Sequence, residues 1–93
     1  MINYHIMVSG MVQGVGFRWS TYQLAKKLGL TGFVKNLPDG QVYIEVQGKS
    51  RVMHQFLTAI RDGTIAPYAR IERYKVTPAN LDDRTDFTIS TDW

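Results

Sequence analysis

The chain has 93 residues, with 11 lysine and arginine side chains against 8 aspartate and glutamate side chains, a formal net charge of +3 at pH 7. Its 44% hydrophobic and 20% charged content fits one small globular domain over residues 1–93, which would bury about 60 to 70% of its unfolded surface. Without cysteine it cannot form disulfides or thiolate metal sites, and no apolar run approaches the roughly 18 residues of a membrane span. Because the N-terminus lacks the basic start and apolar core of a secretion signal, we expect a cytoplasmic protein.

The first predicted strand covers residues 4–9, where apolar and polar side chains alternate. A glycine-rich stretch, residues 10–18, follows it. Apolar side chains then recur at helical spacing and predict an amphipathic helix over residues 17–28, with Gly29 as its C-terminal cap: Phe17, Thr21, Leu24, Ala25 and Leu28.

The rest of the chain contains further strand patterns and a second helix. Residues 31–37 and 41–47 read as two strands joined by a turn at residues 38–40, and Ser50 is the expected N-cap of a second helix that Gly63 ends. Residues 70–77 form a fourth strand, whose broken alternation indicates a bulge, and Phe87 and Ile89 mark a short final strand. The order β-α-β-β-α-β predicts an α+β, ferredoxin-like sandwich: an antiparallel sheet with two helices on one face and a short extra C-terminal strand.

The glycine-rich stretch has the features of an anion site. Gly14 and Gly16 can adopt positive φ, which lets successive N–H groups converge, and the stretch leads into a helix N-terminus. Arg18 adds a planar fork of donors that matches phosphate, although a cation is disfavoured at this end of a helix unless an anion accompanies it. Neither a dinucleotide fingerprint nor a Walker A loop is present, since Trp19 stands where the former needs glycine or alanine.

The string Val12-Gln13-Gly14-Val15-Gly16-Phe17-Arg18, followed by Gly32-Phe33-Val34-Lys35-Asn36-Leu37-Pro38-Asp39-Gly40, closely resembles the acylphosphatase family over nearly the whole chain. The resemblance implies hydrolysis of acyl phosphates to a carboxylate and inorganic phosphate, with Arg18 binding phosphate and Asn36 positioning water. It also implies that five residues form the phosphate cradle: Gln13, Gly14, Val15, Gly16 and Phe17. Three departures from the family pattern concern pocket shape and stability: Trp19, Phe33 and the pair Gly48-Lys49.

The residues themselves support this chemistry. In the predicted topology the first and second strands run parallel, so residues 10–18 and Asn36 reach the same edge of the sheet. An asparagine cannot act as a base at neutral pH, but its amide can hold an attacking water. Neither motif offers a general acid for an alkoxide, so the leaving group should be a carboxylate. We expect neither metal, cofactor nor covalent intermediate, since His5 and His54 lack metal-ligand spacing and Ser9 and Ser20 lack a partnered base.

Two alternatives remain open. The same element order describes an RNA recognition module, whose stacking positions would fall on His5, Met7, Tyr43, Glu45 and Gln47, a poor aromatic platform. In the second alternative, the chain is a non-catalytic domain that binds an anion at the glycine-rich stretch but does not turn over a substrate. We expect a monomer whose partners are a small-molecule acyl phosphate and inorganic phosphate, without specific nucleic acid or membrane binding.

Overall fold

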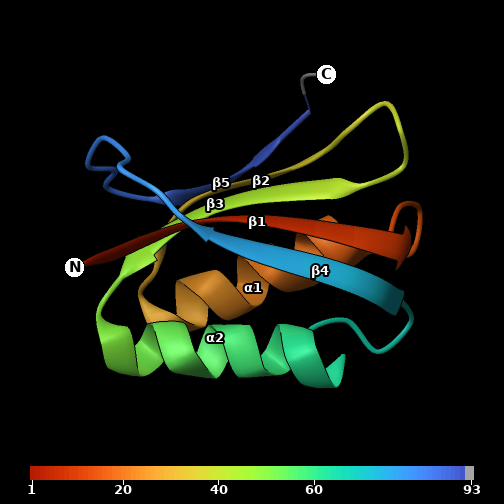
Figure 1. Ribbon diagram of the computed structural model, residues 1–93, viewed down its shortest axis with the longest axis horizontal. Helices are drawn as coiled ribbons and strands as arrows, with labels where there is room; N and C mark the ends of the chain where they lie inside the picture. Colours follow the sequence, from red (N-terminus) through yellow and green to blue (C-terminus); the bar gives the residue numbers. More distant parts are fainter. Residues whose placement is uncertain (92–93) are drawn as a thin grey trace.

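The computed structural model describes residues 1–91, which form two helices and a five-stranded sheet (Figure 1). In chain order the elements are β1 (Ile2–Met11), α1 (Phe17–Leu28), β2 (Thr31–Asn36), β3 (Val42–Gly48), α2 (Ser50–Asp62), β4 (Arg70–Pro78) and β5 (Phe87–Ser90). Both helices cover one face of the sheet, and the other face is open (Figure 1). The predicted β-α-β-β-α-β order with a short extra strand is confirmed.

The strand order across the sheet is β4-β1-β3-β2-β5. β3 pairs antiparallel with both β1 and β2, and β4 pairs antiparallel with β1. β5 runs parallel to β2, so the C-terminal strand makes the antiparallel sheet a mixed one. Because β1 and β2 both oppose β3, their C-terminal ends reach the same edge of the sheet, as the topology argument predicted.

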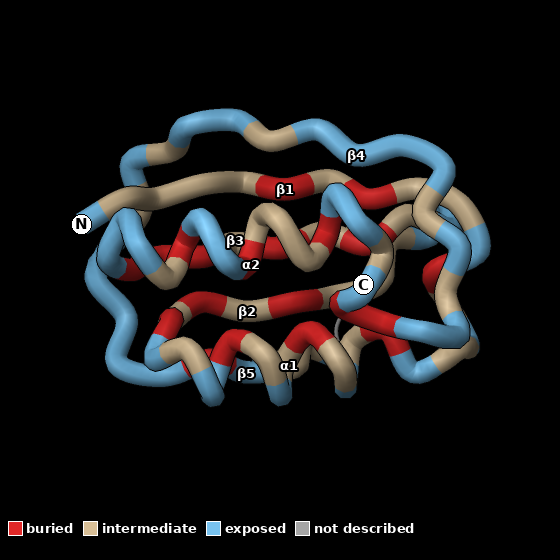
Figure 2. The backbone as a smooth tube through the Cα atoms, turned by 90° about the horizontal axis from the view of Figure 1, so that it is seen from below, coloured by how far each residue is buried: buried red, intermediate tan, exposed pale blue. Residues whose placement is uncertain are grey.

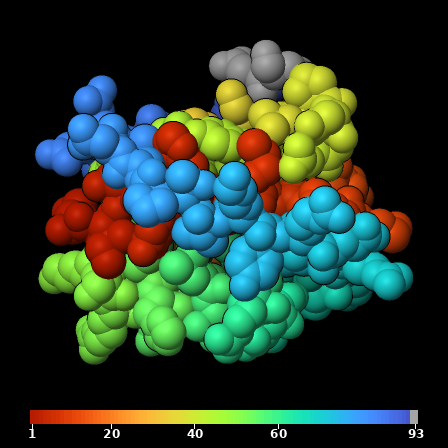
Figure 3. All heavy atoms as spheres, viewed as in Figure 1, coloured from red at the N-terminus to blue at the C-terminus, as the bar shows by residue number. Residues whose placement is uncertain are grey.

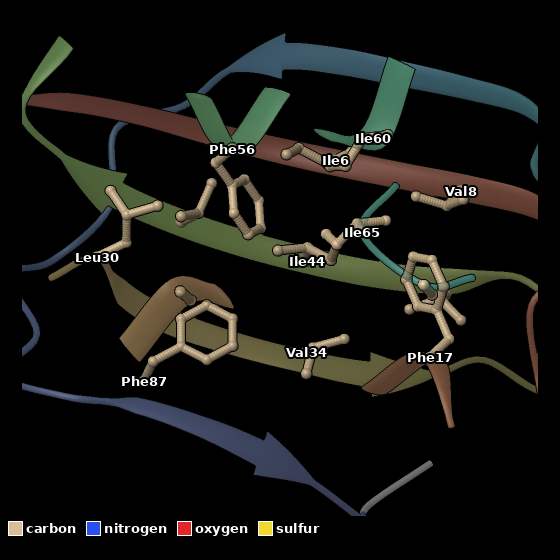
Figure 4. Packing of buried hydrophobic residues seen from close by; sticks show 14 of the residues in the cluster. Ile6, Val8, Phe17, Leu30, Val34, Ile44, Phe56, Ile60, Ile65 and Phe87 are labelled. Atoms are coloured by element: carbon tan, nitrogen blue, oxygen red, sulfur yellow. The ribbon is translucent and has the colours of Figure 1, made fainter. Parts of the chain in front are cut away.

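The core fills the layer between the sheet and the helices. Figure 4 shows side chains from the sheet, such as Val34 and Ile44, against helix residues such as Phe17 and Phe56. In Figure 2 the buried positions follow β1, β3, β2 and the inner faces of both helices, whereas β4 is mostly exposed. Hydrophobic burial of this kind is the main force holding α1 against the sheet, and α1 carries the candidate site.

The helix caps predicted from the sequence are present with one exception. Gly29 and Gly63 end the helices in the left-handed conformation, as predicted. The prediction of Ser50 as an N-cap is wrong, because the carbonyl of Lys49 already accepts the N–H of Met53 and α2 begins one residue earlier. In the part of the chain that the structure describes, neither helix is long and apolar enough to cross a membrane.

The predicted irregularity in β4 is also present. Ser9 pairs with Arg73 while Gly10 pairs with Ile71, so β4 uses one more residue than β1 at this point. The extra residue, Glu72, forms a bulge that increases the twist at the end of β1. The sheet therefore bends next to the point where the glycine-rich loop begins.

Candidate active site

The loop between β1 and α1 contains two glycines in the left-handed conformation. Gly14 has φ 76°, and Gly16, the N-cap of α1, has φ 78° and ψ 17°. A Cβ at either position would meet nothing within 4 Å, so space does not require glycine there. The backbone conformation does, because a residue with a side chain pays roughly 1–2 kcal/mol in this region.

The start of α1 suits an anion. Within residues 1–91 no side chain caps the helix at Gly16, and its first turn, Phe17 to Ser20, contains no acidic residue. The first N–H groups of a helix have no partner inside the helix, and its dipole favours negative charge at this end. An anion bound here would supply the missing acceptors.

A cavity of about 230 Å³ lies at this point of the molecule. It is lined by residues from the loop, from the start of α1, from the end of β2 and from β5 and its following residue: Val12, Gly14, Gly16, Phe17, Arg18, Trp19, Asn36, Ile89 and Thr91. The structure thus brings together Arg18, Asn36 and three of the five residues expected in the cradle. Segments far apart in sequence meet at the shared edge of β1 and β2.

Asn36 is the last residue of β2 and pairs with Val42 of β3. Since side chains alternate along a strand, Asn36 shares the helix-facing side with buried Val34. Its Oδ1 atom is buried and accepts no hydrogen bond from any residue in the described range 1–91. A buried acceptor without a partner is costly, and a water or ligand donor in the cavity would relieve that cost.

Arg18 lies in the first turn of α1 and is partly buried. Its Nη1 donates a hydrogen bond of 3.3 Å to the carbonyl oxygen of Ser90 at the end of β5. A guanidinium has five N–H donors in a fixed plane, so this single bond orients the group and leaves donors for an anion. β5 therefore orients the arginine as well as extending the sheet.

Gln13 and Val15 are placed differently from the other cradle candidates. Gln13 Nε2 donates hydrogen bonds of 2.8 Å to the carbonyl oxygens of Leu37 and Gln41, at the base of the turn between β2 and β3. This turn, in yellow in Figure 3, lies against the orange surface of the loop. Val15 packs against the hydrophobic core. These two side chains hold the loop in place and do not line the cavity.

Comparison with known proteins agrees with this geometry. The family model named Acylphosphatase matches residues 4–89. An acylphosphatase from Archaeoglobus fulgidus is 42% identical over 90 residues, covering 97% of this chain and 99% of its own. The crystal structure of acylphosphatase from Bacillus subtilis superposes with a TM-score of 0.89 at 36% identity, covering 97% of this chain and 99% of that one. The chain belongs to the acylphosphatase family.

The histidines and Tyr43 of this acylphosphatase-family chain lie outside the cavity lining. His5 Nε2 lies 3.9 Å from Glu45 Oε2 on the open face of the sheet, and His54 is exposed on α2. Burial, together with a 2.7 Å hydrogen bond to Glu45, raises the pKa of Tyr43. Among residues 1–91, no three histidine, aspartate or glutamate side chains are grouped so that they could hold a metal ion.

The sequence-predicted site residues do not include four residues that line the cavity: Val12, Trp19, Ile89 and Thr91. Trp19 enters the sequence analysis only as a departure from the family pattern, although its position next to Arg18 in the first turn of α1 is a usable signal. Ile89 and Thr91 reach the cavity only because β5 pairs with β2, more than fifty residues earlier in the chain. No local pattern announces a parallel pairing over that separation.

Proposed function

We propose that this chain hydrolyses acyl phosphates, with the phosphoryl group held by Arg18 and the backbone N–H groups of residues 14–18 and with an attacking water positioned by Asn36. One observation carries the proposal: Asn36, whose Oδ1 is buried and has no partner among the described residues, lines the same cavity as Arg18 and the start of α1. An anion site and a water acceptor within one cavity are the two requirements of hydrolysis at phosphorus. Membership of the acylphosphatase family supports the same reaction.

The reaction follows from these groups. The water oxygen forms a bond to phosphorus while the bond between phosphorus and the carboxylate oxygen breaks, and the carboxylate leaves as a stable anion. One O–H of the water donates a hydrogen bond to Asn36 Oδ1, and its proton stays on the oxygen that becomes part of the phosphate; the other proton passes to a second phosphate oxygen or to solvent. Arg18 and the helix start stabilise the charge on the equatorial oxygens, because phosphoryl transfer depends chiefly on positioning and electrostatics.

Direct attack by water, without a covalent intermediate, is supported by the cavity lining. The residues that line it in the described chain offer no carboxylate, imidazole or thiol. Thr91 brings a hydroxyl, but a hydroxyl needs an adjacent base to act as a nucleophile, and none of these residues supplies one. The site acts on the substrate through hydrogen bonds and charge.

The test is hydrolysis of benzoyl phosphate without added metal, with Asn36→Ala measured beside the wild type. We expect the variant to lose turnover by about a hundredfold or more, while the inhibition constant of inorganic phosphate changes far less. Asn3→Ala is the matched control, since Asn3 Oδ1 is also buried and unpartnered within the described residues but lies at the start of β1. Equal turnover in wild type and Asn36→Ala would exclude the water-positioning role.

The RNA-binding alternative has weaker support. Three rings do adjoin on the open face, with centroids 5.7 Å apart between His5 and Tyr43 and 5.9 Å apart between Phe33 and Tyr43. Arg84 and Lys35 also bring positive charge over the Phe33 ring, at 5.2 Å and 6.0 Å from its centroid, which favours an anionic strand. However, Glu45 accepts the hydroxyl of Tyr43 in the middle of this group. A carboxylate among the rings repels a phosphate backbone, so we keep the proposal that the chain binds no specific nucleic acid.

We further propose that the chain acts as a monomer in the cytoplasm. The site uses residues of one chain, since the loop, β2 and β5 that line the cavity all come from it. Size-exclusion chromatography with light scattering tests the oligomeric state, and a fluorescent fusion expressed at native level tests the location.

A further inference from the structure

The candidate cavity has a second wall that phosphate binding does not use. Trp19, Ile89 and Val12 line it beside the loop and Arg18. Arg18 is the one charged residue among the described residues that line the cavity, and in the proposed mechanism it binds the phosphoryl group. The rest of the substrate therefore meets mostly apolar side chains.

Trp19 is unusually exposed for so large an apolar side chain, at 56% of its surface. Its indole nevertheless has a fixed support, because it stacks on the ring of Tyr22 with centroids 5.5 Å apart and an interplanar angle of 21°. Tyr22 follows three residues later on the same face of α1 and packs against the core. The stack supports the indole, which lines the cavity.

β5 also contributes to the cavity lining. Ile89 pairs with Val34 of β2 and is partly buried, and its aliphatic side chain lines the same cavity as the indole. The hydrogen bond from Arg18 to Ser90 fixes this end of β5 to the start of α1. The contact that orients Arg18 therefore also connects the two elements that carry Trp19 and Ile89.

We propose that Trp19 and Ile89 form a subsite for the acyl group, and that the chain prefers acyl phosphates whose acyl group is apolar and flat, such as an aromatic ring. An acyl group that carries a second phosphate or a carboxylate finds no second cation among the described residues of this lining. The cavity of about 230 Å³ is smaller than the roughly 300–1,000 Å³ of pockets for drug-sized ligands, so the acyl group is compact. This inference rests on the proposed hydrolysis of acyl phosphates.

The kinetic test compares kcat/KM for benzoyl phosphate and acetyl phosphate in the wild type, Trp19→Ala and Trp19→Phe. Each variant is compared with the wild type on the same substrate, so the different reactivity of the two acyl phosphates cancels. We expect Trp19→Ala to lose about tenfold more on benzoyl phosphate than on acetyl phosphate, and Trp19→Phe to keep most of the preference. Tyr68→Ala removes an aromatic ring that is 87% exposed outside the cavity lining, and it should change neither value.

A binding measurement separates this inference from the proposed function. Phenylphosphonate and methylphosphonate carry the same anionic group, and calorimetry gives their dissociation constants without turnover. We expect phenylphosphonate to bind about tenfold more tightly to the wild type and the difference to disappear in Trp19→Ala.

Each outcome has a definite meaning. Equal binding of the two phosphonates to the wild type, or an equal loss on both substrates in Trp19→Ala, overturns the subsite even if hydrolysis is fast. Tighter binding of phenylphosphonate that depends on Trp19, in a protein that hydrolyses neither substrate, supports the subsite and overturns the proposed hydrolysis.

Discussion

The side-chain amide nitrogen of Gln13 lies 2.8 Å from the carbonyl oxygen of Leu37, the residue that follows Asn36. The same nitrogen donates to the carbonyl of Gln41, whose oxygen also accepts the N–H of Leu37 at 2.8 Å. One amide group thus links the phosphate loop to both strands of the hairpin. In the proposed mechanism, the relative position of the phosphate and the attacking water depends on this link.

Gln13→Met tests the link, because methionine has a similar length and no donor. We expect the free energy of unfolding to fall by about 1–3 kcal/mol, since two carbonyls lose a donor. Turnover of benzoyl phosphate should fall by about tenfold to a hundredfold from misplacement of the water, with a far smaller change in phosphate inhibition. Urea unfolding and steady-state kinetics measure the two effects.

Gln41→Met is the control, since the side chain of Gln41 donates its hydrogen bond to Asp39 within the turn. It should leave kcat near the wild-type value. A Gln13→Met variant that is destabilised but keeps full kcat would mean that Gln13 supports the fold without positioning the reacting groups.

Much of this arrangement was predictable from local patterns. The bounds of α1 followed from its apolar stripe and Gly29, and the meeting of Arg18 with Asn36 followed from the order of the elements. The contact of Gln13 with Leu37 did not, because a glutamine amide has no sequence signal for a partner 24 residues away. The contribution of β5 was equally hidden, since four residues of strand carry no information about which neighbour they pair with.

Arg18→Lys should separate the charge of the arginine from its geometry. Lysine keeps the positive charge but loses the planar set of N–H donors. It therefore cannot donate to the carbonyl oxygen of Ser90 and at the same time donate two coplanar hydrogen bonds to an anion. We expect the inhibition constant of inorganic phosphate to rise about tenfold to a hundredfold, which corresponds to the loss of one charged hydrogen bond. Arg18→Ala should raise this inhibition constant further. Competitive inhibition kinetics give the inhibition constant. If Arg18→Lys has the same inhibition constant as the wild type, phosphate binding requires only a positive charge at this position.

Metal removal and histidine replacement should have little effect on the rate. Hydrolysis of benzoyl phosphate is expected to persist in excess chelator, with inorganic phosphate as a competitive inhibitor. His5→Ala with His54→Ala should keep kcat near wild type, because neither ring lines the cavity. Recovery of a chelator-treated enzyme by divalent metal, or a collapse of the double variant, would show that the proposed site lacks an essential group.

The pair Lys26 and Asp86 should make stability depend on pH through the contact between α1 and the residue before β5. Lys26 Nζ lies 2.7 Å from Asp86 Oδ1, which also accepts the N–H of Phe87. The hydrogen bond from Lys26 and then that from Phe87 lower the pKa of Asp86 below its ordinary value of 3.8, and Asp86 raises the pKa of Lys26 above 10.5. Because the pKa of Asp86 is lowered on folding, its ionised carboxylate stabilises the fold fully above pH 3.8. Because the pKa of Lys26 is raised, its ammonium group stabilises the fold fully below pH 10.5, so the pair contributes in full between these two pH values.

Asp86→Asn tests this contribution. The variant should unfold at a lower urea concentration than the wild type at neutral pH, and the difference should shrink as the pH falls from 3.8 through the lowered pKa of Asp86. Asp83→Asn, an exposed aspartate in the same loop, controls for the general effect of removing a negative charge. A difference between wild type and Asp86→Asn that stayed constant down to about pH 2 would show that the ionised carboxylate is not what stabilises this contact.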